Sequence, residues 1–189
     1  MKRQQISFGA QIRVVLTTSG LVAVIEVINL VTGRELNRFG LIPRDIDAFY
    51  GVLTAPLLHG SSTHFLSNIV PLAIFSLLLL QHGVRRFWLV TAGCILLSGA
   101  LVWLFGRGSI HVGASGLIYG YFGYLVVAGL LSGEIKLMLI SIVVGIGYGG
   151  LIFGVLPSDP NISWESHLFG FIAGIVCAFL WGKDTSAAA

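Results

Sequence analysis

The amino-acid sequence predicts an all-α membrane protein in which six helices cross a bilayer. Hydrophobic residues make up 56% of the 189 residues and charged residues only 10%, with a mean hydropathy of +0.92. A soluble domain of this size cannot cover so much apolar surface with so few charges. Long apolar runs also recur between short polar turns, and an isolated run in lipid satisfies its own backbone hydrogen bonds only as a helix.

A single polytopic membrane domain is expected to occupy residues 1–189. The first apolar run is about 18 residues long, which suits an uncleaved membrane span better than the core of a signal peptide. Glu26 lies within this run, and we favour a carboxyl group hydrogen-bonded to a neighbouring helix over a gating or proton-transfer role. The expected helices cover about residues 14–31, 64–80, 88–105, 113–131, 135–156 and 165–181.

Residues 32–63 form the longest stretch without a continuous apolar run, and this first loop is expected to lie on the membrane interface. It carries three arginines against three acidic residues, together with Pro43 and Pro56. Apolar and aromatic residues are interleaved with these charges, which is typical of a segment partly embedded in the membrane. They are Leu41, Ile46, Phe49, Tyr50, Val52 and Leu53.

The distribution of Lys and Arg predicts a multi-pass protein of the cell membrane with both termini in the cytoplasm. Because the basic residues are scattered among the turns, the net charge of +3 indicates control of topology, and no nucleic-acid partner is expected. Cys94 and Cys177 lie inside apolar runs and are expected to be packing residues. The cytoplasmic basic residues are Lys2, Arg3, Arg13, Arg85, Arg86, Lys136 and Lys183, and the outer ones are Arg34, Arg38, Arg44 and Arg107.

Polar side chains that an apolar helix has no packing reason to contain occur at the beginnings of the second, fourth and sixth predicted helices. His64 and Asn68 begin the second helix, Ser115 the fourth and His167 the sixth. Because successive spans alternate in direction, these three helices begin on the same side of the bilayer, which the charge distribution makes the outer side. The sequence therefore predicts a polar site that opens to the outer side.

Helical spacing places these side chains on shared faces, beside small residues. Residues four apart face one direction, so His64 pairs with Asn68, and Ser115 pairs with Tyr119. Small residues three or four positions apart let membrane helices approach closely, so the fourth and sixth helices are expected to pack backbone to backbone. This packing would bring Ser115 within reach of His167. The glycines concerned are Gly116, Gly120, Gly123, Gly170 and Gly174.

These residue types together indicate a Ser–His catalytic dyad. A serine hydroxyl is a poor nucleophile until a base takes its proton, and a neutral histidine is the usual base near pH 7. The Asn68 amide, the His64 ring and the Ser115 backbone N–H are candidate donors to the oxyanion of a tetrahedral intermediate. Tyr119 is expected to hold the ring of His167.

Other polar residues near this set are weaker candidates. Glu165 lies two positions before His167 and so points to a different face, and Asp159 lies in a loop, so no carboxylate is assigned to the dyad. His111, four residues before Ser115, is a rival base that is expected to precede the helix. A metal site from His59, His64 and His167 lacks a carboxylate or thiol partner, so neither a metal nor another cofactor is expected.

In these motifs the sequence resembles the rhomboid family of intramembrane serine proteases, in its minimal six-helix form. The resemblance covers about residues 10–182 and follows the order of the family's motifs. One departure is that many relatives carry a Trp-Arg pair in the first loop, where this sequence has Arg44 and Tyr50. The matching motifs are His64-x-x-x-Asn68, Gly113-Ala-Ser115-Gly116 and His167-x-x-Gly170-x-x-x-Gly174.

The resemblance implies a serine-type endopeptidase that cleaves transmembrane segments of other membrane proteins near the outer face, through an acyl-enzyme. Ser115 would be the nucleophile and His167 its base, with His64, Asn68 and backbone N–H groups around Ser115 at the oxyanion. Tyr119 would pack on His167, and the fifth helix with the loop after it would act as a gate and cap. The expected partners are transmembrane protein substrates and the lipid bilayer, and the sequence sets no oligomeric state.

Two alternative functions use the same residues differently. One is a catalytically inactive rhomboid-like protein that binds membrane clients, but such proteins usually lack the serine or the histidine, and this sequence has both. The other is a small transporter or channel, which would favour an internal repeat and polar residues spread through the depth of the bilayer. The polar residues here lie at one level, which favours the protease.

Overall fold

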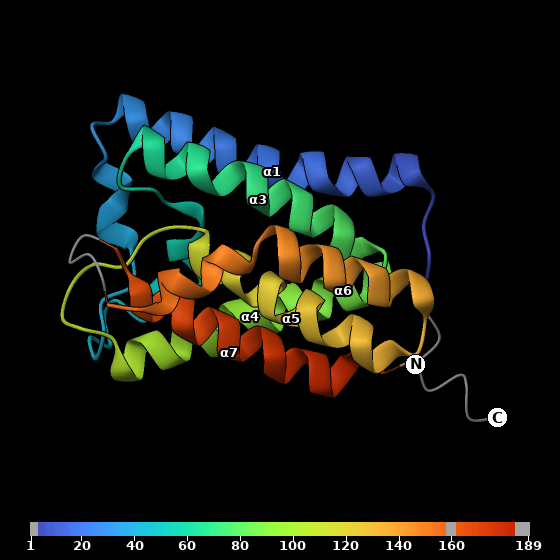
Figure 1. The fold of residues 1–189 in the computed structure, drawn as a ribbon. Helices are drawn as coiled ribbons and strands as arrows, with labels where there is room; N and C mark the ends of the chain where they lie inside the picture. The colour runs from blue at the N-terminus through green and yellow to red at the C-terminus, as the bar shows by residue number, and fades with distance from the viewer. Residues whose placement is uncertain (1–3, 158–161, 184–189) are drawn as a thin grey trace.

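The computed structural model describes residues 4–157 and 162–183, which form a bundle of long helices joined by short loops (Figure 1). Within these residues, five helices are long and apolar enough to cross a membrane, and a sixth span is formed when the bent pair α6 (Ile135–Gly147) and η3 (Gly149–Val155) is counted as one. The all-α fold of a multi-pass membrane protein is thereby confirmed. The five are α1 (Phe8–Val31), α3 (Ser62–Leu80), α4 (Val84–Phe105), α5 (Ser115–Ser132) and α7 (Trp164–Trp181).

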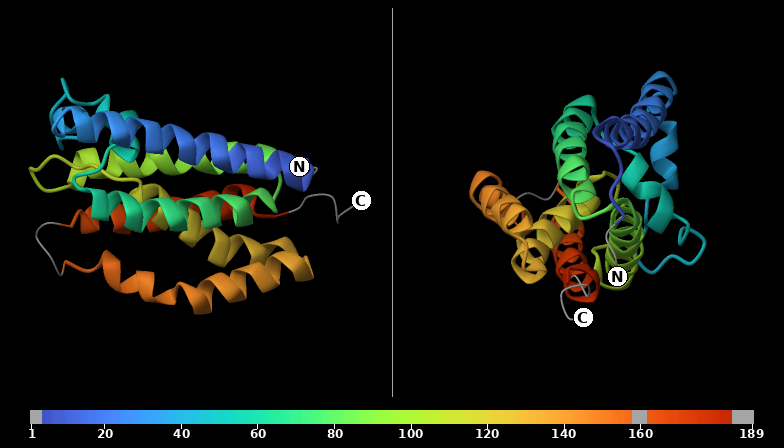
Figure 2. Two further views of the ribbon diagram at one scale, coloured as in Figure 1. Left: turned by 90° about the horizontal axis from the view of Figure 1, so that it is seen from above. Right: turned by 90° about the vertical axis from the view of Figure 1, so that its right-hand side faces the viewer.

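The α5 helix is the centre of the bundle. Within α5, 67% of the span is buried inside the protein, against 22–33% for the other four long helices. It packs against α3, α4, α6 and α7, whereas α1 lies at the edge of the bundle against α3 (Figures 1 and 2). Ser115, the first residue of α5, therefore belongs to the most buried of the long helices.

The interface between α5 and α7 is formed by the backbones of two glycine stripes. A Cβ atom added at Gly170 would clash with the carbonyl oxygen of Gly116, and one added at Gly174 would clash with that of Gly120. Any side chain at either position would force the two helices apart. The structure thus has the backbone-to-backbone packing that the sequence predicts.

The fifth predicted helix, residues 135–156, is not continuous in the structure. The α6 helix ends at Gly147, and the 3-10 helix η3 follows after a bend of 59°. Glycines at 145, 147, 149 and 150 explain the break, because each glycine disfavours a helix by about 1 kcal/mol relative to alanine. After the bend, η3 contacts α7, which brings the end of this segment to the beginning of α7.

The first loop is folded against the bundle and contains three short helical segments, η1 (Glu35–Phe39), α2 (Gly51–Thr54) and η2 (Ala55–Leu57). Its inner side packs Leu41, Val52 and Ala55 into a cluster with Val102 of α4. Its outer side leaves apolar and aromatic side chains exposed, as expected of a segment that contacts lipid. The exposed residues are Phe39, Ile46, Phe49, Tyr50 and Leu53.

The end of α4 anchors this loop without a Trp-Arg pair in the loop itself. Trp103 of α4 donates its indole N–H to the Asp45 carbonyl oxygen at 2.9 Å and packs edge-on against Phe49, with ring centroids 5.4 Å apart. Arg44 donates its guanidinium to the Gly106 carbonyl oxygen at 2.7 Å. The tryptophan that holds the loop is therefore supplied by the neighbouring helix.

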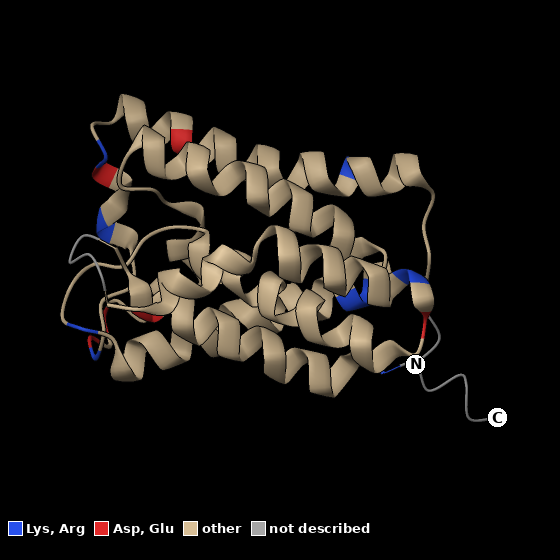
Figure 3. Ribbon diagram, in the orientation of Figure 1, with Lys and Arg blue, Asp and Glu red and all other residues tan. Residues whose placement is uncertain are grey.

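The two ends of the bundle differ in what they carry. The first loop and the beginnings of α3, α5 and α7 lie at the left-hand end in Figure 1, while α1 begins and α7 ends at the right-hand end. Lys, Arg, Asp and Glu gather toward these two ends, as expected of a bundle whose middle lies in hydrocarbon (Figure 3). Lys2, Arg3 and Asp159 lie outside the described residues. The three helices that carry the candidate site residues begin at the same end, as helix alternation predicts.

Candidate active site

A cavity of about 430 Å³ lies where α3, α5 and α7 begin. Ser115, His167 and His64 line it, so three of the predicted site residues converge from three helices. A water molecule takes about 30 Å³ in the liquid, so the cavity has room for several waters. Its other lining residues are Gly60, Ser61, Ser67, Ile110, Val112, Ile162 and Ser163.

Ser115 is the first residue of α5 and follows a turn that requires glycine. Gly113 has a φ of +127°, which L side chains rarely adopt, and a Cβ atom there would lie 2.7 Å from Nε2 of His64. The Gly113 N–H donates to the Ala55 carbonyl oxygen at 2.9 Å, which ties the turn to the first loop. Within the described residues the Ser115 N–H has no hydrogen-bond partner, so this helix terminus offers a donor to an anion.

His167 is held on two sides. Its ring stacks on the ring of Tyr119, with centroids 4.2 Å apart and planes 6° apart. Its Nδ1 is 2.8 Å from the carbonyl oxygen of Gly154 in η3. Because a carbonyl oxygen only accepts hydrogen bonds, Nδ1 carries the proton, and Nε2 of the neutral ring keeps a lone pair. A fixed ring with a free Nε2 lone pair is what a general base requires.

The contact between the two candidate catalytic side chains is not closed. Ser115 and His167 line the same cavity, but in the part of the chain that the structure describes no hydrogen bond joins Ser115 Oγ to His167. Such hydrogen bonds are often long in empty sites and shorten when substrate binds. The fold thus brings nucleophile and base candidates to one cavity and orients the base.

Of the predicted oxyanion donors, His64 faces the cavity and Asn68 lies beneath it. The Ser61 hydroxyl caps α3 by accepting the His64 N–H at 3.1 Å, and the His64 ring lines the cavity. Asn68 is buried, does not line the cavity, and donates its Nδ2 to the His64 carbonyl oxygen at 2.6 Å. In this arrangement Asn68 supports the backbone of His64.

The rival base His111 holds loops together instead of facing Ser115. Its Nδ1 is 2.8 Å from Ser163 Oγ and its Nε2 is 3.1 Å from the Arg107 carbonyl oxygen. Burial lowers the pKa of His111, although the hydrogen bond to Arg107 acts in the opposite direction.

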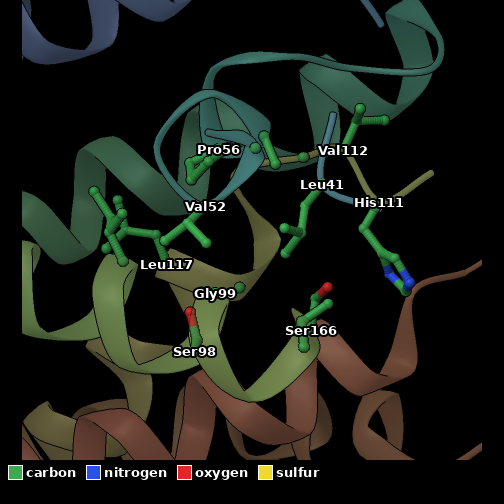
Figure 4. A pocket seen from close by; sticks show the side chains of 15 residues that line it. Leu41, Val52, Pro56, Ser98, Gly99, His111, Val112, Leu117 and Ser166 are labelled. Atoms are coloured by element: carbon green, nitrogen blue, oxygen red, sulfur yellow. The ribbon is translucent and has the colours of Figure 1, made fainter. Parts of the chain in front are cut away.

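Figure 4 looks into a second, smaller cavity beneath the first loop, and the His111 ring points away from it. Glu165 pairs with Arg107 at 3.3 Å.

His59, which the sequence suggests is only a loop residue, is fully buried behind the nucleophile. Its Nε2 accepts the N–H of Ala114, the residue before Ser115, at 3.4 Å. Burial, with smaller contributions from His64 and Arg34, lowers the pKa of His59 to about 4, so the ring is neutral at pH 7 and Nε2 is free to accept. A histidine followed by Gly60 in an irregular segment carries no periodic signal, so the sequence alone does not reveal this contact.

The fold and the cavity together define a multi-pass membrane protein with serine and histidine side chains gathered at one end of an apolar bundle. Residues 47–184 match the Rhomboid domain family. That match covers more than half of the chain, and the chain belongs to the rhomboid family.

Several known proteins are similar to this chain over most of its length. An uncharacterized protein of Mycobacterium tuberculosis is 37% identical over 88% of this chain and 73% of its own length. The putative rhomboid protease YdcA of Bacillus subtilis is 32% identical over 70% of this chain and 67% of its own length. RHOMBOID-like protein 4 of Arabidopsis thaliana is 30% identical over 71% of this chain and 34% of its own length.

Proposed function

We propose that this protein is an intramembrane serine endopeptidase that cleaves transmembrane segments of other membrane proteins. The observation that carries the proposal is the convergence of Ser115, His167 and His64 on one cavity at one end of the bundle. Membership of the rhomboid family, together with similarity to a putative rhomboid protease, supports the same function. Ser115 is the nucleophile and His167 the general base.

The first chemical step follows from the tautomer of His167. With Nδ1 donating to Gly154, the Nε2 lone pair takes the proton of the Ser115 hydroxyl as its oxygen attacks the scissile carbonyl carbon. Nε2 then gives this proton to the departing amine, which leaves an acyl-enzyme ester on Ser115. Water then attacks the ester with Nε2 of His167 again taking a proton, and the ester bond breaks as Nε2 returns this proton to Ser115 Oγ and the new carboxyl end leaves. The stack on Tyr119 holds the ring in place through these transfers.

Two groups are placed to stabilise the oxyanion of the tetrahedral intermediate. The Ser115 N–H lies at the N-terminus of α5, where the helix dipole also favours negative charge. The His64 ring lies beside Gly113 at the wall of the cavity. Asn68 contributes by holding the first turn of α3 and is not assigned a direct contact with the oxyanion.

The substrate is a transmembrane segment that reaches the cavity from the surrounding lipid. The peptide bonds of a helical segment are shielded by their own hydrogen bonds, so the segment must unwind locally before a carbonyl reaches Ser115. The distribution of Lys and Arg favours a cavity on the outer side and both termini in the cytoplasm.

Proteolysis of a single-span test protein in liposomes tests this function. Ser115→Ala and His167→Ala should each lower the cleavage rate by at least about 1000-fold, because dyad members act as a unit. Ser98→Ala is the matched control, since Ser98 is a buried helix serine bonded to the Cys94 carbonyl oxygen, and its rate should stay within about 2-fold of the native rate. Cleavage by Ser115→Ala at the native rate would contradict the proposed function.

A further inference from the structure

The α1 helix buries a carboxylate, which needs a physical explanation in a membrane helix. Glu26 lies on the side of α1 that faces the bundle, and its side chain is only 6% exposed. Its Oε1 is 2.7 Å from Nη1 of Arg34, which lies beyond the end of the same helix. The buried residues of α1 are Gln11, Val15, Val22, Glu26 and Asn29.

The chain reverses after α1 so that Arg34 returns along the helix. Gly33 and Arg34 have φ values of +66° and +71°, and the second of these is unusual for a residue with a side chain. The guanidinium then meets three acceptors. Besides Glu26, Nη1 is 3.0 Å from the His59 carbonyl oxygen and Nη2 is 3.2 Å from Ser62 Oγ. One side chain thus joins α1 to the segment that precedes α3.

The carbonyl oxygen of His59 is the focus of this cluster. It accepts from Arg34, from Asn29 Nδ2 at 3.3 Å and from Asn37 Nδ2 at 3.2 Å. Asn29 Nδ2 also donates to Asn37 Oδ1 at 2.9 Å, which ties α1 to the first loop. Three side-chain donors on one carbonyl fix the His59 backbone more firmly than a turn alone would.

The other end of His59 faces the nucleophile. Its ring accepts the N–H of Ala114 at 3.4 Å and packs edge-on against the ring of His64, with centroids 5.2 Å apart. Ala114 directly precedes Ser115, and His64 lines the cavity. The backbone of His59 is therefore held by α1 and the first loop, while its ring touches both sides of the candidate site.

We propose that the Glu26–Arg34 ion pair positions the nucleophile through His59. The pair fixes the His59 carbonyl, and the His59 ring then fixes the turn before Ser115 and the ring of His64. This inference rests on the proposed function and deepens it, because Glu26 and Arg34 lie outside every motif of the site. Neither of them lines the cavity, so they are positioning residues that do not touch substrate.

The carboxylate selects the conformation of Arg34. Without Glu26 the guanidinium loses its shortest contact, and its long side chain can extend toward solvent, since it is already 21% exposed. The planar guanidinium also reaches Glu26, His59 and Ser62 at once, which the single ammonium of a lysine does not reproduce. The cluster therefore depends on both charge and shape.

Kinetics of the full chain in liposomes separate positioning from binding. Glu26→Gln should lower kcat for a single-span substrate by about 10-fold while KM stays within about 2-fold, because misplacement by 1 Å can cost about 100-fold in rate. Glu35→Gln is the matched control. Glu35 pairs with Arg38 at 3.8 Å, both side chains are exposed, and both constants should change by less than about 2-fold.

A second pair of variants guards against general loss of fold. Arg34→Met removes the charge and all three contacts, whereas Arg34→Lys keeps the charge and a contact with Glu26. The kcat of Arg34→Lys should lie between those of the native chain and Arg34→Met. The SDS-induced unfolding midpoint of Arg34→Lys should match that of the native chain, which shows that its lower kcat reflects geometry.

Hydrogen–deuterium exchange at the Ala114 amide gives a readout that needs no catalysis. The exchange rate should rise by about 10-fold in Glu26→Gln and stay unchanged in Glu35→Gln. If native protein cleaves and Glu26→Gln matches Glu35→Gln in kcat and exchange, the positioning role is overturned and the protease stands. If native protein does not cleave, the proposed function fails, and the exchange comparison alone decides whether the ion pair holds the turn.

Discussion

The α5–α7 interface and the contacts of α1 with the rest of the bundle are built in opposite ways. Between α5 and α7, glycines such as Gly170 and Gly174 bring two backbones together with no space for a side chain. Between α1 and its neighbours, polar side chains such as Glu26 and Asn29 make directed contacts. One interface is set by shape and the other by hydrogen bonds and charge.

This difference shows how the fold divides two tasks. The glycine interface places Ser115 and His167 on adjacent helices. The backbones of these helices lie too close together for side chains to fit between them at the glycines. The polar contacts of α1 and the first loop act at longer range, through the His59 backbone. Changes at the α5–α7 glycines should therefore act mainly on stability, and changes at the Glu26–Arg34 pair mainly on the geometry of the site.

The largest expected effect lies in the glycine interface. Gly174→Ala should destabilise the protein by about 3 kcal/mol, because the new Cβ clashes with the Gly120 carbonyl oxygen and backbone cannot yield as a side chain can. Gly20→Ala in α1 is the matched control, since a Cβ atom there would meet no atom within 4 Å, and its midpoint should hold or rise. Equal SDS-induced unfolding midpoints for both variants would break the contrast between the interfaces.

The next effect is an acid sensitivity on the side of the first loop. Burial lowers the pKa of His59 to about 4 from its ordinary 6.5, so the unfolded chain binds the proton more readily. The contribution of neutral His59 to the free energy of unfolding is complete above pH 6.5 and is lost as pH falls toward 4. The loss by pH 5 is about 2 kcal/mol. The free energy of unfolding should follow this course in native protein and be flatter in His59→Gln. Parallel curves for the two proteins would contradict it.

A smaller change sharpens the comparison at the site itself. Gly154→Ala places a methyl group against the Tyr119 hydroxyl, which should disturb the stack on His167 and lower the cleavage rate by about 10-fold. Gly150→Ala in the same 3-10 helix has no atom near its Cβ and should keep the native rate. Cleavage assays on both variants check this, and equal rates would show that the stack is not needed.

The smallest effect concerns the anchor of the first loop. Trp103→Phe removes the indole N–H that donates to the Asp45 carbonyl oxygen, while keeping the aromatic contact with Phe49. The loss should be about 1 kcal/mol of stability, the usual net worth of one hydrogen bond. Thermal unfolding in detergent measures it. A loss as large as that of Gly174→Ala would mean that the loop carries more of the fold than its contacts indicate.

The sequence predicts the features that depend on pattern. Composition and apolar runs predict the all-α membrane fold, and helix alternation predicts that α3, α5 and α7 begin at one end. Spacing predicts the close approach of α5 and α7, because a glycine stripe can be found from the sequence of its own helix and small residues let membrane helices approach closely. The roles of Ser115 and His167 in catalysis stay predictions until activity is measured.

The sequence does not predict features that depend on contacts between distant segments. At the bend after Gly147, the apolar run favours one continuous helix and the glycines disfavour it. Hydropathy alone therefore predicts a single helix there. The inward position of Asn68 depends on how far α3 is rotated, which spacing within the helix does not set. The contact between His59 and Ala114 crosses 55 residues of sequence without a repeated pattern.

Covalent labelling of the folded protein by a fluorophosphonate tests the central claim most directly. Such a reagent phosphonylates a serine only when a base takes its proton, so mass spectrometry should find a single adduct on Ser115. The labelling rate should fall by at least about 100-fold in His167→Ala. An adduct on another residue, or an unchanged labelling rate in His167→Ala, would contradict the Ser115–His167 dyad.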